Sequence, residues 1–362
     1  MTDVMGDGFG NASSLHKRGL NAARLVTDAQ NTISEVVGGG PWNVVFTSGG
    51  SESDTQAILG SVPRGKRDRV VTSTLEHAAV EESCKRLEKR GCSAVVIKAG
   101  ERGVVDPEEM AAAVDSRVAL VSLTHVAGEI GTVQNVGEVA RRVKAKAKRC
   151  KMHVDGVQAL AQLASLNYPP EVDMVSISAH KIHGPQGIGA LLLRPNVKPA
   201  PLIAGGDQQG GLGPGTFNLP GIAGFGVATR ILRKRRAQTI AAMGKLTDLL
   251  VNGIESNVPG VTLLGDRSCR APGMAVFAVD RVPSEVLLHA LEMRGVLASS
   301  SSACHSRRKS PPRSLRHAGL KANQGAVRFS LTTDTTWSEI EGAIKAFIEA
   351  VDTIRSGRAG KL

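Results

Sequence analysis

Short apolar runs alternate with helical patterns over the first half of the chain. Runs of strand length occupy residues 44–47, 69–73, 94–98, 118–126, 151–155, 174–178 and 189–193. Between them, apolar residues recur at helical spacing near 21–37, 52–60, 79–90, 107–114 and 136–148. This alternation predicts an α/β fold in which a mostly parallel, seven-stranded sheet is covered by helices.

The pattern changes after a glycine-rich turn at 205–215. A long helical stretch is followed by patterns of strand, helix, strand and helix, at 221–256, 274–279, 284–293, 326–331 and 337–354. We therefore expect a large domain over residues 1–220. Residues 221–362 should form a connecting helix and a smaller α+β domain.

Lys181 lies just beyond the predicted strand 174–178, with Ser178 and His180 beside it and a Gly-Pro turn after it. A lysine held rigidly at a strand end suits a Schiff base with pyridoxal phosphate, and neighbouring polar groups can bind the phosphate oxygens. A single lysine is more commonly a solvated surface charge. The interpretation therefore depends on the other strand ends.

Asp155 ends the preceding predicted strand, and Gln158 follows three residues later. Pyridoxal phosphate withdraws electrons effectively when its ring nitrogen is protonated, and a buried carboxylate beside that nitrogen keeps it so. Gln158 could donate a hydrogen bond to the phenolic oxygen of the ring. The alternative is that Asp155 is only a turn residue.

Two further strand ends carry suitable groups. Gly50 and Ser51 open a predicted helix, whose N-terminal N–H groups and serine hydroxyl can bind a phosphate. His77 follows the strand near 69–73 and could stack on the pyridine ring. Alone, Ser51 could be a helix cap and His77 a buried structural imidazole. Together with Lys181 and Asp155, they favour a cofactor site.

These motifs resemble the class V aminotransferase superfamily, and within it the cysteine desulfurases and selenocysteine lyases. The matching segments span residues 10 to about 335 and comprise 10–16, 46–54, 76–77, 129–134, 153–158, 178–190, 215–216, 299–306 and 328–330. The resemblance implies the pyridoxal-phosphate-dependent transferase fold type I. It also implies a homodimer in which Thr216 reaches the cofactor phosphate of the other subunit.

Cys304 lies in a serine-rich segment, 298–313, that also contains Arg307, Arg308, Lys309 and Arg313. This composition predicts an exposed loop, and the cations favour the thiolate that attacks sulfur. An unreactive surface cysteine is the alternative from the residues alone. The resemblance favours a nucleophile, because desulfurases carry theirs on such a loop. Ala-Cys-His-Ser also occurs in selenocysteine lyases, so the motif does not name the substrate.

Several positions depart from the family pattern. Ala127 and Gly128 stand where the family has two asparagines, and Gly213 stands where it has an arginine. Thr333 replaces the arginine that usually follows the carboxylate-binding residue, here Arg328. The chain also begins at the motif near residue 10, so its N-terminus is shorter than the family's. These departures keep open a non-catalytic homologue that acts as a scaffold or partner subunit.

The combined expectation is a pyridoxal-phosphate-dependent cysteine desulfurase that gives L-alanine and a persulfide on Cys304. By the resemblance, Arg328 binds the substrate carboxylate, and Lys181 or His77 transfers protons. The persulfide would then pass to an acceptor or scaffold protein for iron–sulfur cluster assembly or thiolation. A selenocysteine lyase acting on L-selenocysteine remains the alternative enzyme.

The charge and the aromatic content of the chain bear on which partners it could bind. The 45 basic and 33 acidic residues give a net charge of +12, concentrated at 141–149 and 230–236. Such clusters usually form solvated helix faces, with nucleic acid, a nuclear import receptor or an acidic protein partner as alternatives. The 3% aromatic content disfavours single-stranded nucleic acid.

The cellular location is predicted from what the sequence lacks. Five cysteines without paired or metal-ligand spacing predict a reducing compartment and no metal site. No apolar run reaches membrane-spanning length, and the acidic N-terminus does not resemble a signal or transit peptide. We expect a cytoplasmic protein, with mitochondrial and nuclear locations left open.

Overall fold

The computed structural model describes residues 1–6, 8–300 and 313–357. Contacts between residues divide the chain into two compact units. The first unit comprises Met1–Ile97, Pro107–His125 and Asn135–Arg236. The second comprises Lys98–Asp106, Val126–Gln134 and Ala237–Leu362. Each unit has its own sheet.

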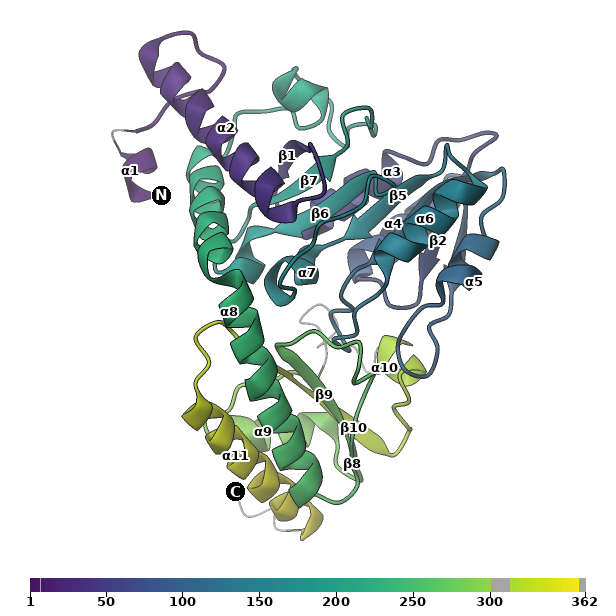
Figure 1. The fold of residues 1–362 in the computed structure, drawn as a ribbon, viewed down its shortest axis with the longest axis vertical. Coiled ribbons are helices and arrows are strands. Elements are labelled where there is room, and N and C mark those ends of the chain that lie inside the picture. The colour runs from purple at the N-terminus through teal and green to yellow at the C-terminus, as the bar shows by residue number, and fades with distance from the viewer. Residues whose placement is uncertain (7, 301–312, 358–362) are drawn as a thin grey trace. The chain divides into compact units, whose positions relative to one another are not determined.

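The first unit is built on a seven-stranded sheet with the order β1-β7-β6-β5-β4-β2-β3 (Figure 1). Its strands are β1 (Asn43–Thr47), β2 (Arg69–Ser73), β3 (Ser93–Ile97), β4 (Val118–Thr124), β5 (Lys151–Asp155), β6 (Met174–Ser178) and β7 (Gly189–Leu193). Only β7 is antiparallel to its neighbours among these strands. The predicted fold class, a mostly parallel seven-stranded sheet, is confirmed.

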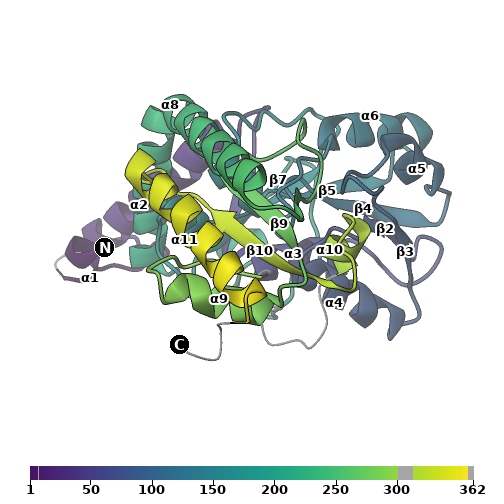
Figure 2. The same ribbon diagram turned by 90° about the horizontal axis from the view of Figure 1, so that it is seen from below.

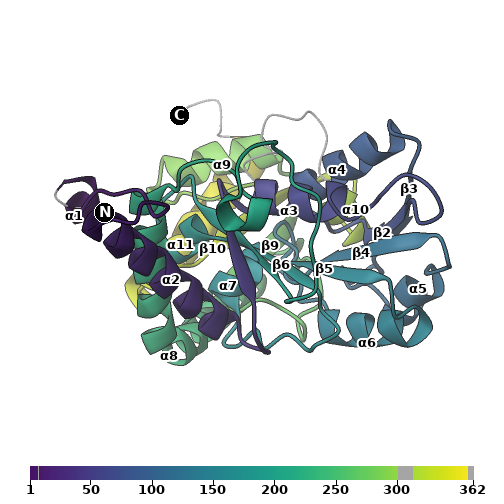
Figure 3. The same ribbon diagram turned by 90° about the horizontal axis from the view of Figure 1, so that it is seen from above.

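Helices cover both faces of this sheet, as its apolar strands require. On one side lie α3 (Gly50–Leu59) and α4 (Ala78–Glu88), and on the other α5 (Pro107–Ala112) and α6 (Val136–Lys146), as Figure 3 shows. The α3/α4 side encloses an apolar core that includes Ile58, Val70, Leu120 and Leu191. The remaining helical segments of this unit are α1 (Thr2–Met5), α2 (Lys17–Val37), α7 (Val157–Gln162), η1 (Ala179–Ile182) and η2 (Gln208–Gly211).

Parallel strands place their carboxyl ends at one edge of the sheet. Residues 48–51 follow β1, residues 74–77 follow β2, Gly156 follows β5 and residues 179–181 follow β6. The sequence motifs therefore gather at this edge, although they are far apart along the chain.

The second unit contains a three-stranded antiparallel sheet of the order β10-β9-β8. Its strands are β8 (Val261–Leu263), β9 (Met274–Asp280) and β10 (Gln324–Ser330). Figure 2 shows α9 (Ser284–Glu292), α11 (Trp337–Arg355) and the C-terminal part of α8 (Leu219–Asn257) against this sheet. The rings of Phe277, Phe329 and Phe347 lie 6.0–6.1 Å apart in the shared core. A short helix, α10 (Arg313–His317), precedes β10.

The elements agree closely with the predicted ranges, except that the pattern missed the short segments α1, α7, α10 and β8, of three to six residues, and the turns η1 and η2. Much of the basic charge on α6 and α8 is locally partnered. Arg141 and Arg142 bind Glu138, and Arg233 binds Glu35. Across the described residues, no helix is both long and apolar enough to cross a membrane.

Candidate active site

Asp155, the last residue of β5, is buried at the carboxyl edge of the sheet. Its carbonyl oxygen accepts the N–H of His125 at 2.9 Å, and its Oδ1 accepts the N–H of Val157 at 3.0 Å. Burial raises the pKa of Asp155, and the N–H of Val157 and the charges of His77 and Lys181 oppose that rise. The structure thus brings a lysine and an imidazole close to one buried carboxyl group.

Lys181 is held by a tight turn after β6. It lies half-buried in η1, where the N–H of Gly184 closes the turn on the carbonyl oxygen of Ala179 at 2.9 Å. A Cβ at Gly184 would lie 2.9 Å from the Cβ of Ala179, so the turn needs glycine there. The turn fixes the backbone that carries Lys181, whose charge acts on Asp155.

His180 and Ser178 form a pair beside this turn. The Ser178 hydroxyl lies 2.7 Å from Nδ1 of the exposed His180 ring. Partial burial, followed by the charge of Lys181, lowers the pKa of His180. The two side chains therefore present a neutral polar pair next to the lysine.

Gly50 and Ser51 form the first turn of α3, which packs closely on α7 and β7. A Cβ at Gly50 would lie 2.6 Å from Cγ2 of Val157, and a Cβ at Gly189 would lie 2.7 Å from Cα of Gly49. First-turn N–H groups have no acceptor within the helix, and Ser51 is exposed beside them. The first turn of α3 is therefore a polar cradle. It packs on Val157, which lies two residues after Asp155 in the sequence.

His77 caps α4, and its Nδ1 accepts the N–H of Ala79 at 3.1 Å. The adjacent Glu76 is buried, with Oε1 accepting the Ser73 hydroxyl at 2.6 Å and the N–H of Thr124 at 3.2 Å. Burial raises the pKa of Glu76 to about 8. A neutral acid and an oriented imidazole thus flank Asp155.

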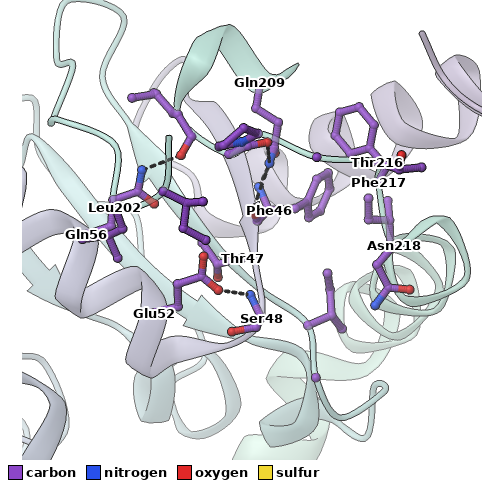
Figure 4. Close-up of a pocket in the computed structure, with 18 residues that line it drawn as sticks. Phe46, Thr47, Ser48, Glu52, Gln56, Leu202, Gln209, Thr216, Phe217 and Asn218 are labelled. Carbon is purple, nitrogen blue, oxygen red and sulfur yellow. Dashed lines mark hydrogen bonds between the residues drawn. The ribbon is translucent and has the colours of Figure 1, made fainter. Parts of the chain in front are cut away.

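Gln158 and Thr216 occupy different surroundings. Gln158 is half-buried at the second position of α7. Thr216 lines a pocket of 290 Å³ together with Ser48 and Glu52 (Figure 4). In that pocket the Gln209 side chain binds both main-chain groups of Phe46, at 2.6 and 3.0 Å. Thr216 therefore lies near the residues that follow β1 and does not line the surroundings of Asp155 described above.

Arg328 belongs to the second unit, on β10. Its Nη1 donates to the carbonyl oxygen of Gly128 at 2.6 Å, while its buried Nε has no partner among the described residues. Burial lowers its pKa, and the charge of Glu129 opposes this. Glu129 is also hydrogen-bonded by Ser314. Cys304, the predicted nucleophile, lies outside the described residues.

The sequence reasoning missed a buried polar band behind Asp155. Ser122, His153 and Ser176 lie on neighbouring strands, and Asp54 on α3 faces them. The alternation His-x-Asp in β5 and Ser-x-Ser in β6 places these groups on one sheet face. That alternation was the available signal.

Comparisons with known proteins agree over nearly the whole chain. The sequence model of the aminotransferase class-V family matches residues 1–342. The cysteine desulfurase of Cereibacter sphaeroides is 38% identical over 364 residues, covering 98% of this chain and 92% of that protein. Cysteine desulfurase IscS of Klebsiella pneumoniae subsp. pneumoniae is 35% identical over 354 residues, covering 96% and 86%.

Solved structures give the same picture. A NifS-like protein superposes with a TM-score of 0.87 at 30% identity, covering 97% of this chain and 94% of that one. DndA from Streptomyces lividans has a TM-score of 0.79 at 32% identity, covering 91% and 94%.

Proposed function

The chain belongs to the cysteine desulfurase family of class-V aminotransferases, and we propose that it is a pyridoxal-phosphate-dependent cysteine desulfurase. In this proposal it converts L-cysteine to L-alanine and retains the sulfur as a persulfide on Cys304. The supporting observation is the buried carboxyl of Asp155 with Lys181 and His77 close enough to act on its charge.

The residues at the sheet edge fit the cofactor. A protonated pyridine ring needs a buried anion, and Asp155 is a buried carboxyl group that a nearby cation would favour in its charged form. The cradle formed by Gly50 and Ser51 offers helix N–H groups and a hydroxyl to a phosphate. Lys181 supplies the amine. When bound, pyridoxal phosphate draws electron density from the α-carbon of an amino acid.

Each side chain at the sheet edge would have its own role in binding the cofactor or moving a proton. Asp155 Oδ2 would hold the proton on the ring nitrogen while Val157 fixes Oδ1. His77 would stack on the ring, oriented through the N–H of Ala79. Gln158 would donate to the phenolic oxygen, and Ser178 and His180 would bind phosphate oxygens. Lys181 Nζ would anchor the cofactor and transfer the α-proton.

Arg328 and Cys304 would act on the substrate. Arg328 retains a buried Nε without a protein partner among the described residues, which suits a guanidinium that binds a carboxylate. The Cys304 thiolate would attack the substrate sulfur, forming an S–S bond while the Cβ–S bond breaks. The carbon skeleton keeps that electron pair and takes up a proton to become L-alanine.

Assembly and location belong to the same proposal. Several apolar side chains of the first unit are exposed, with accessible fractions of 91% for Leu15, 49% for Leu20, 46% for Val227 and 56% for Ile231. Burying them against a second copy would support a homodimer, within which Thr216 would reach the other subunit's cofactor. We propose a cytoplasmic enzyme that passes its persulfide to an acceptor protein.

The deciding experiment measures both products of one reaction. Purified protein with pyridoxal phosphate and L-cysteine should release alanine, and sulfide when a reductant is present. Lys181→Ala should abolish both, whereas Lys345→Ala, an exposed lysine on α11, should leave them unchanged. A wild-type protein that binds the cofactor yet forms no alanine would favour the scaffold homologue.

A further inference from the structure

The ring of His153 is completely buried between two serine hydroxyls on neighbouring strands. Its Nδ1 lies 2.9 Å from Oγ of Ser122 on β4, and its Nε2 lies 2.9 Å from Oγ of Ser176 on β6. Burial lowers the pKa of His153 to about 3, so the ring is neutral at physiological pH. A neutral imidazole donates at one nitrogen and accepts at the other. Each hydroxyl must therefore take the complementary role.

Asp54, on α3, lies at the far end of this chain of hydrogen bonds. It is only 1% exposed, and its Oδ1 lies 3.6 Å from Nε2 of His153, which is too long for a direct hydrogen bond. Oδ1 has no hydrogen-bond partner among the described residues, and the side-chain hydrogen bond with Ser176 lowers the pKa of Asp54. A buried, charged carboxylate with one oxygen lacking a donor would be costly.

The groups facing Asp54 also disfavour its charge. Asp155 and Glu76 are the two acids that act on it, and the neutral His153 supplies no counter-charge. Burial first, then the charge of Asp155, raises the pKa of Asp54, against the opposing effect of Ser176. Asp155, by contrast, has His77 and Lys181 beside it. Of two carboxyl groups that repel each other, the one beside Lys181 should ionise.

We propose that Asp54 is a positioning residue for Asp155, held uncharged on the Ser176–His153–Ser122 chain so that Asp155 carries the negative charge. This inference rests on the proposed function, because the charge of Asp155 matters through the cofactor ring that it would face. Asp54 touches neither cofactor nor substrate in this scheme.

The direction of the hydrogen bonds along this chain depends on whether Asp54 is protonated. With Asp54 protonated, its O–H donates to Ser176, Ser176 donates to Nε2 of His153, and Nδ1–H donates to Ser122. With Asp54 ionised, Ser176 must donate to it, so His153 carries its proton on Nε2. The tautomer of His153 therefore distinguishes the two states.

The first test reads that tautomer by NMR of apoprotein labelled with ¹⁵N-histidine at neutral pH, with the signal assigned through His153→Gln. We expect the Nδ1–H form, and the Nε2–H form or a doubly protonated ring overturns the proposal. This measurement needs no cofactor. If the wild-type protein bound no pyridoxal phosphate, the proposed function would fail while the state of Asp54 would still be decided.

The second test compares Asp54→Asn and Asp54→Leu for pyridoxal phosphate affinity, by spectroscopic titration of folded apoprotein over a range of pH. Leucine removes the partner of Ser176 and should weaken binding about tenfold, as one lost hydrogen bond would. Asparagine resembles the neutral acid, so Asp54→Asn should bind pyridoxal phosphate within about threefold of wild type. The acid limb of its pH profile, where affinity falls as the pH is lowered, should lie at the same pH as in wild type. Undiminished binding by Asp54→Leu overturns the positioning role. If Asp54 is charged in the wild type, the acid limb of Asp54→Asn shifts by about one pH unit or more, which also overturns the proposal.

Discussion

Nη1 of Arg328 donates a hydrogen bond to the carbonyl oxygen of Gly128 at 2.6 Å. The residue proposed to bind the substrate carboxylate thus donates one hydrogen bond to the main chain, at the position where the family resemblance implies an asparagine side chain. Because Gly128 is not in the left-handed region, a larger residue meets no backbone strain there. Because Arg328 binds the backbone oxygen of residue 128, this hydrogen bond can also form when residue 128 carries a side chain.

Gly128→Asn is therefore expected to lower the KM for L-cysteine about tenfold, through one returned hydrogen bond of about 1–1.5 kcal/mol. Steady-state kinetics of alanine release measures it, with Gly342→Asn on α11 as a control, where a Cβ meets nothing within 4 Å. An unchanged or higher KM would mean that another group already fills the role of the missing asparagine.

Arg194 joins several segments of the first unit. Its guanidinium donates to the carbonyl oxygens of Val172, Gly39, Tyr168 and Pro169 at 2.8–3.1 Å and stacks over Trp42 at 3.8 Å. An ammonium group cannot reproduce this planar arrangement. Arg194→Lys should lower the free energy of unfolding by about 2–4 kcal/mol, as denaturant unfolding would show. The exposed Arg235→Lys is the control, and equal stability of the two variants would contradict the expectation.

Glu76 should make stability depend on pH. Its pKa is about 8 in the folded protein and is taken as the usual 4.5 in the unfolded chain, so the folded state holds the proton more tightly. Stability from this group is complete below pH 4.5 and is lost as the pH rises towards 8. Glu76→Gln mimics the neutral acid and should gain stability relative to wild type as the pH rises, by about 4 kcal/mol near pH 8.

Unfolding free energies measured from pH 4.5 to 8 check this expectation for Glu76. Glu88→Gln, at the exposed end of α4, serves as the control and should follow the wild-type curve. Parallel curves for Glu76→Gln and wild type would show that Glu76 is charged at neutral pH in the folded protein.

The sheet and the edge that carries the candidate site could be predicted because they depend on local pattern and on one rule of parallel topology. Strand ends converge, so Lys181, Asp155 and His77 were expected to meet before any contact was known. The role that we propose for Asp54 could not be predicted. Strand alternation shows that His153 and Asp155 share a face, but the helix covering that face follows only from tertiary packing.

Long-range hydrogen bonds explain a second difference, between the domain expected from the sequence pattern and the units found in the structure. Residues 98–106 and 126–134 join the second unit, although the pattern along the chain places them inside the large domain. Gln134 donates to the carbonyl oxygen of Gly103 at 3.1 Å, and Gly131 accepts from the N–H of Ala271 at 2.7 Å. Such pairings leave no periodic trace in the sequence.

The fate of Cys304 separates cysteine desulfuration from selenocysteine lyase activity. Desulfuration needs a thiolate to take the sulfur, so Cys304→Ala should reduce alanine release from L-cysteine by about a hundredfold or more. Selenium is the better leaving group, and its loss does not require that attack. Cys269→Ala is the matched control, because Cys269 is free and exposed.

We expect wild type to act well on L-cysteine, because the cations that follow Cys304 in the sequence favour its thiolate, and Cys304→Ala to be inactive on L-cysteine. Alanine release from both amino acids should be measured for wild type and both variants. A Cys304→Ala variant that retains much of its activity on L-selenocysteine, beside a wild type that turns over L-cysteine poorly, would instead identify a selenocysteine lyase. Loss of activity in Cys269→Ala as well would contradict the assignment of Cys304 as the sulfur acceptor.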